Sequence, residues 1–70
     1  MPTTTVSAVK ANDTAFENAV QKIVEVFQIE LLNARDDAAR KAAADTATKG
    51  INFYKDAHDA MEKIISAVLP

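Results

Sequence analysis

The sequence predicts an all-α protein, a self-associating helical hairpin with a short first helix and a long second helix. Apolar residues recur every three or four positions in two long stretches, the spacing that places side chains on one face of an α-helix. A short polar segment separates the two stretches. A chain of 70 residues buries a small share of its surface, and without cysteine it forms no disulfides. Association with other chains is the remaining source of stability.

Residues 1–12 show no helical stripe. They are rich in Thr, Ser and Ala and contain an early proline, so we expect a flexible arm before a single helical-hairpin domain of residues 13–70. Thr14 and Glu17 have the spacing of a capping box, in which both side chains accept hydrogen bonds from backbone N–H groups at a helix start. The first helix is therefore expected to begin at Thr14.

The first helix carries one main apolar stripe. Its members are Phe16, Val20, Ile23, Phe27, Leu31 and Ala34. Further apolar residues beside the stripe leave only a narrow polar face. One partner helix cannot cover so wide a surface.

The segment from Asn33 to Asp37 is the expected turn. Asn tolerates helix-ending conformations, and consecutive acidic residues favour the positive N-terminal end of a following helix. Beyond the turn, an acid precedes a base by four residues in three pairs, each adding about 0.2 to 0.5 kcal/mol of helix stability. The pairs are Asp36 with Arg40, Asp37 with Lys41, and Asp45 with Lys49.

Gly50 allows two arrangements of the second half. It is a good C-cap before a separate last helix starting near Asn52. Alternatively, an apolar heptad seam passes through it in phase, and a glycine inside a helix costs only about 1 kcal/mol. We expect the continuous helix, from about residue 36 to 68. At about 33 residues and roughly 50 Å it is longer than a first helix of about 20 residues and roughly 30 Å, so its apolar C-terminal end projects.

The seam of the second helix is the predicted self-association surface. Its first part is small enough to let another backbone approach closely, and its second part fills volume. The predicted residues are Ala43, Ala47, Gly50, Tyr54, Ala57, Met61, Ile64, Ile65, Val68 and Leu69.

The sequence offers little chemistry. His58 and Glu62 are one helical turn apart, but two ligands are too few for a metal, so we expect no metal site, no cofactor and no catalytic residue. The net charge of -2 and the dispersed Lys and Arg residues do not favour nucleic acid. No stretch approaches the roughly 20 apolar residues of a transmembrane helix, and no cleaved secretory signal is recognisable.

The run Tyr54-Lys55-Asp56, followed by Asp59-Ala60 and Ile64-Ile65, resembles the tail of type III secretion needle subunits. The chain is also similar in scale to Hrp-type pilus subunits. The resemblance implies a short helical hairpin without a cleaved signal that assembles into a helical tube, with other secretion-apparatus proteins as further partners. The chain departs from those families in a turn without proline and in its Leu69-Pro70 end.

Two functional hypotheses follow. The first is a non-enzymatic filament subunit of a secretion needle or pilus, secreted or at the cell surface and assembled through its helix faces. The second is a cytoplasmic adaptor or regulator that forms a closed, homodimeric four-helix bundle.

Overall fold

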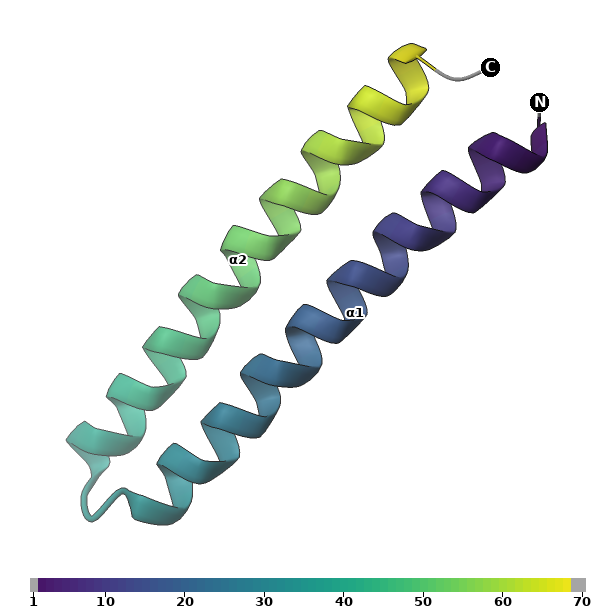
Figure 1. Ribbon diagram of the computed structural model, residues 1–70. Helices are drawn as coiled ribbons and strands as arrows, with labels where there is room; N and C mark the ends of the chain where they lie inside the picture. The colour runs from purple at the N-terminus through teal and green to yellow at the C-terminus, as the bar shows by residue number, and fades with distance from the viewer. Residues whose placement is uncertain (1, 69–70) are drawn as a thin grey trace.

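The computed structural model describes residues 2–68, which form two antiparallel helices. Helix α1 spans Pro2–Asn33 and helix α2 spans Asp37–Val68, and the two lie side by side along their length (Figure 1). The described ends of the chain lie together at the end of the hairpin opposite the turn. The predicted all-α helical hairpin is therefore confirmed.

Helix α1 begins at Pro2, so the prediction that it begins at Thr14 is wrong and residues 2–12 are helical. A proline is tolerated in the first turn of a helix, where its missing N–H has no intrahelical partner. Ala8 and Asn12 precede Phe16 at intervals of four and are half-buried, so they extend the stripe that packs on α2. With 32 residues in each helix, α1 accompanies α2 along its whole length.

The turn lies where the sequence places it, between Asn33 and Asp37. Asp36 caps α2: its Oδ1 accepts a hydrogen bond from the Ala39 N–H at 2.8 Å, and its carbonyl accepts one from the Arg40 N–H at 3.1 Å. Because the Asp36 carboxylate is used as a cap, Arg40 pairs with Asp37 instead of with Asp36. The acidic side chain of Asp37 stands in the first turn of α2, where the helix dipole favours it.

Helix α2 continues through Gly50, as the unbroken seam predicts, and Gly50 does not adopt a positive φ. The alanine-rich segment before it is helical although it contains two threonines. The hydroxyls of Thr46 and Thr48 donate to the carbonyls of Ala42 and Ala44, at 3.0 and 2.9 Å, so both hydroxyls are satisfied within the helix and share carbonyls that also accept backbone N–H groups.

The core is a thin seam between the helices. Ala43 and Ile65 are the buried apolar residues of the described part of the chain, at 3% and 6% exposure. The predicted stripe of α1 lies against α2, although Leu31 is exposed at its edge. The molecule measures 53 × 16 × 8 Å, and its radius of gyration of 16.1 Å exceeds the roughly 11 Å of a globular chain of this length. Neither α1 nor α2, as described from residue 2 to 68, combines the length and apolar character of a membrane-spanning helix.

Candidate functional site

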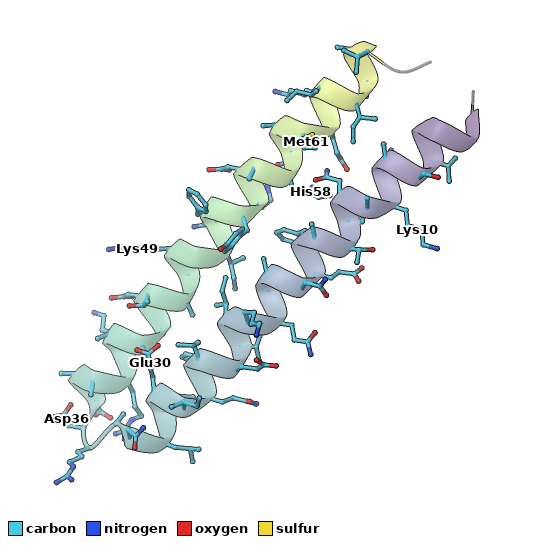
Figure 2. All side chains as sticks on the ribbon, in the orientation of Figure 1. Lys10, Glu30, Asp36, Lys49, His58 and Met61 are labelled. Atoms are coloured by element: carbon cyan, nitrogen blue, oxygen red, sulfur yellow. The ribbon has the colours of Figure 1, made fainter. Side chains whose placement is uncertain are left out.

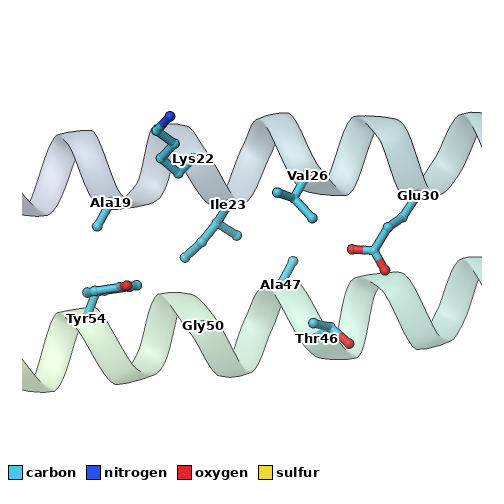
Figure 3. Close-up of a pocket in the computed structure, with 9 residues that line it drawn as sticks. All are labelled: Ala19, Lys22, Ile23, Val26, Glu30, Thr46, Ala47, Gly50 and Tyr54. Carbon is cyan, nitrogen blue, oxygen red and sulfur yellow. The ribbon is translucent and has the colours of Figure 1, made fainter.

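An apolar groove runs along one side of the hairpin. Three adjoining hollows form it: the first and second share Ala19 and Tyr54, and the first and third share Glu30 and Thr46. Figure 3 shows the first hollow, with side chains of α1 pointing toward small residues of α2. We call the combined surface the inter-helix groove. Its apolar lining comprises Ala15, Phe16, Ala19, Ile23, Val26, Ile29, Ala34, Ala39, Ala42, Ala43, Ala47, Gly50, Tyr54, Ala57 and Met61.

Gly50 sets the width of the groove at its centre. A Cβ atom at this position would lie 3.0 Å from Cδ1 and 3.5 Å from Cγ1 of Ile23. The absence of a side chain therefore lets α1 approach α2 closely. Alanines at positions 43 and 47 continue this row of small side chains, so this face of the alanine-rich segment packs against α1 of the same chain.

The predicted self-association residues divide into two groups. The small residues of the first half, and Ile65, lie in the contact between α1 and α2. Tyr54 and Met61 line the groove with about two fifths of their surface exposed, and Ile64 and Val68 are more exposed, at 53% and 70%. Leu69 lies outside the described residues.

The contact face of α2 shifts by one residue towards its C-terminus. The heptad pattern places Ala57 and Ile64 on the seam, but His58 and Ile65 turn further into the hairpin. A straight helix drifts by about 20° per heptad relative to a strict seven-residue repeat. Near Gly50 the heptad seam and the face that contacts α1 therefore coincide, and near the end of α2 the contact face lies one position beyond the heptad seam.

A second apolar hollow is separate from the groove. It is lined by Gln28, Leu31 and Leu32, none of which lines the three hollows of the groove. Leu32 is 86% exposed. We call this surface the Leu32 hollow.

A polar cluster joins the two helices at His58. The Nε2 atom of His58 lies 2.7 Å from Asp13 Oδ1, on α1, and 3.4 Å from Glu62 Oε1, one turn along α2. Its Nδ1 atom lies 3.3 Å from Asp59 Oδ1. Figure 2 shows His58 on the side of α2 that faces α1, whereas Lys49 points away. We call Asp13, His58, Asp59 and Glu62 the His58 cluster.

Two further contacts tie His58 to α1, one through its backbone and one through its ring. The side-chain amide of Asn12 donates a hydrogen bond of 3.0 Å to the His58 carbonyl. The rings of Phe16 and His58 pack with centroids 5.2 Å apart. The His58 side chain is 18% exposed, whereas the carboxylates of the cluster are about half exposed.

The cluster shifts two titrations. Hydrogen bonds with Asp13 and then Asp59 raise the pKa of His58 above its ordinary value of 6.5, with a smaller contribution from the charge of Glu62 and against the opposing effect of burial. The hydrogen bond with His58, followed by that with Lys55, lowers the pKa of Asp59. Protonated His58 is therefore an ion-pair partner of both helices.

Sequence reasoning identified His58 and Glu62 but missed Asp13. The expected helix start at Thr14 left Asp13 outside the helix, so no third ligand was anticipated. An antiparallel hairpin that turns near residue 35 places residue 13 opposite residue 58. The pairing register of the two helices was therefore the signal that could have identified Asp13 as a neighbour of His58.

The fold and the groove define a class of protein, the two-helix hairpin with an open apolar side. Neither protein-family models, curated proteins nor solved structures match this chain. Function is therefore inferred from the hairpin itself.

Proposed function

We propose that this chain is a non-enzymatic, self-assembling structural protein whose hairpins associate through their helix faces. The observation that carries the proposal is unburied surface. The chain exposes 5389 Å², about 1,100 Å² more than the roughly 4,300 Å² of a compact monomer of its mass. A standard interface buries about 800 Å² per partner, so one or two neighbouring copies account for the excess.

The inter-helix groove suits a helix of another copy. Its floor is built from small residues, and its rim carries large apolar side chains that are about half exposed, including Val26 and Ile29. Small residues permit close packing between helices, and burying the rim gains roughly 25 cal/mol for each Å² of apolar surface removed from water.

A filament is the proposed form of the assembly, because the chain has two separate apolar surfaces. One two-fold interface through the groove leaves the Leu32 hollow uncovered. If the groove of one copy receives a different surface of the next, the contact is heterologous and the assembly grows as a ring or a helix. Exposed Leu32 therefore favours open-ended growth.

The specific form proposed is a subunit of a type III secretion needle or Hrp-type pilus. The resemblance of residues 54–65 to needle-subunit tails supports it, as does a hairpin made of two helices. The equal length of α1 and α2 differs from the short-then-long layout of those families. On this proposal the assembled protein lies outside the cell, and other secretion-apparatus proteins are further partners.

Electron microscopy of two charge-introducing variants tests the filament. Wild-type protein is expected to form filaments whose number rises with concentration. Val26→Glu places a carboxylate in the inter-helix groove and Leu32→Glu places one in the Leu32 hollow, and each substitution is expected to abolish long filaments. Gln21→Glu is the control, since Gln21 is exposed and lines neither surface. Discrete small wild-type particles at every concentration and salt would contradict the proposal.

A closed homodimeric four-helix bundle, acting as an adaptor or regulator, is the second candidate. The continuity of the groove along one side favours it, because a single neighbour covers one continuous surface. Light scattering separates the two. A dimer gives a mass fixed at twice 7.6 kDa that Val26→Glu halves and Leu32→Glu leaves unchanged.

A further inference from the structure

The His58 cluster has the donor set of a metal site that the sequence did not predict. Asp13, His58 and Glu62 each place one donor atom within 4.8 Å of those of the other two residues. The donors come from both helices and are separated by 45 residues along the chain between Asp13 and His58. Three protein ligands are the number found in open zinc sites.

We propose that Asp13, His58 and Glu62 bind a divalent transition-metal ion, with Zn²⁺ as the best-fitting ion, and that the ion fastens α1 to α2. Ligand bonds of about 2.0 to 2.2 Å in a tetrahedral site place the donor atoms roughly 3.3 to 3.6 Å apart. The separation of 3.4 Å between His58 Nε2 and Glu62 Oε1 already fits. The 2.7 Å separation from Asp13 Oδ1 must widen, and the half-exposed Asp13 side chain has the freedom to do so.

Asp59 supplies an independent argument, because it orients the imidazole as an outer-shell carboxylate does. Its Oδ1 lies 3.3 Å from Nδ1 of His58, and its other oxygen pairs with Lys55 at 3.3 Å. With the Nδ1 proton donated to Asp59, the lone pair of Nε2 points to the side where Asp13 and Glu62 lie. Metal-binding histidines usually have such a partner.

The donor types indicate which ions fit. One imidazole nitrogen and two carboxylate oxygens suit zinc and related first-row ions, whereas Mg²⁺ and Ca²⁺ prefer oxygen donors alone. Three protein ligands leave a fourth position for water. All three ligands belong to one chain, so the site does not depend on the proposed assembly. By closing the long loop between Asp13 and His58, the ion stabilises the hairpin.

The test is a zinc titration of the full chain after treatment with a chelator. At pH 7.5, calorimetry is expected to give one Zn²⁺ per chain, and the thermal unfolding midpoint measured by circular dichroism is expected to rise. Mg²⁺ at the same concentrations is expected to leave the midpoint unchanged. Because His58 is the single histidine, the ¹⁵N signals of one imidazole report ligation directly.

Four variants assign the ligands. Asp13→Asn, Glu62→Gln and His58→Gln are each expected to weaken Zn²⁺ binding by tenfold or more, and Asp59→Asn by roughly 10- to 100-fold as an outer-shell change. Asp56→Asn makes the same charge change on an exposed position of α2 that is outside the cluster, and is expected to bind as the wild type does.

Four results overturn the proposal. They are an imidazole spectrum that Zn²⁺ does not alter, a Zn²⁺ affinity that His58→Gln leaves intact, an equal response to Mg²⁺, and a stoichiometry of one ion for two chains. The imidazole spectrum and the helical content of each variant are recorded together, so loss of binding is separated from loss of fold.

Discussion

Substitution of Gly50 by alanine tests the closest contact between the two helices. The new Cβ would lie 3.0 Å from Cδ1 of Ile23, nearer than ordinary van der Waals contact, and 3.5 Å from Cγ1, an ordinary contact. The atom that must move is the end of a flexible side chain, and Ile23 lines the open groove. The perturbation therefore sets one favourable effect against one unfavourable effect.

The two effects nearly cancel. Alanine is about 0.8 to 1.0 kcal/mol more favourable than glycine inside a helix. Pushing Ile23 about 30° from its rotamer costs about 0.5 to 1.5 kcal/mol. The net change in the free energy of unfolding is expected to be close to zero, between a loss of about 0.7 and a gain of about 0.5 kcal/mol.

Ile23→Val isolates the contact, because it removes Cδ1 and leaves the atom at the ordinary distance. In that background Gly50→Ala is expected to stabilise the protein by the full helix preference of about 1 kcal/mol. The coupling between the two substitutions is then about 0.5 to 1.5 kcal/mol, which is the strain that Ile23→Val removes. Urea unfolding followed by circular dichroism, at one fixed protein concentration, measures all four proteins. A gain of about 1 kcal/mol in both backgrounds would refute the close approach of Ile23 to Gly50.

Three more outcomes are expected. The hydrogen bonds and charges of Asp13, Asp59 and Glu62 raise the pKa of His58 in the folded protein, so protonated His58 stabilises the fold. This contribution to the free energy of unfolding is fully present below pH 6.5 and is lost as the pH rises through the higher folded pKa. Thermal unfolding in chelator from pH 5.5 to 8.5 should show this decline in the wild type and less of it in His58→Gln. Ile65→Ala should cost about 2 kcal/mol in urea unfolding, and exposed Ile64→Ala less than about 0.5 kcal/mol, so equal losses would contradict the observed seam. Val68→Asp should prevent assembly, seen by electron microscopy, while circular dichroism remains helical; unchanged fibres would count against a role for this end of α2.

The hairpin, the turn and the continuous second helix could be predicted from the sequence because their signals are local. The α1 stripe repeats at helical spacing from Phe16 to Ala34, and the acidic pair after the turn identifies the start of α2. Passage through Gly50 could be predicted because the apolar seam keeps its phase on both sides.

The start of α1 could not be read from its capping pattern. Thr14 and Glu17 are chemically able to cap a helix. Extending the helix by earlier turns that pack against α2 is, however, more favourable than ending it at this cap. Asn12 is an example of this packing, since its side-chain amide donates a hydrogen bond to the His58 carbonyl on α2. A long-range hydrogen bond of this kind has no local signature in the sequence.

The missed helix start also concealed the metal-binding candidate. With residues 1–12 expected to be an arm, Asp13 had no assigned place opposite His58. The heptad pattern also drew attention away from His58, because it placed Ala57 rather than His58 on the seam. The His58 cluster depends more on how α1 and α2 are aligned side by side than on the spacing of its residues along the sequence.

Mass as a function of concentration is the most direct measurement of whether the open hairpin requires other copies. Sedimentation equilibrium from micromolar to millimolar protein, with chelator present, is expected to give masses above 7.6 kDa that increase with concentration. A constant mass of 7.6 kDa across that range, with helix content unchanged, would contradict the claim that other copies cover the exposed apolar surface.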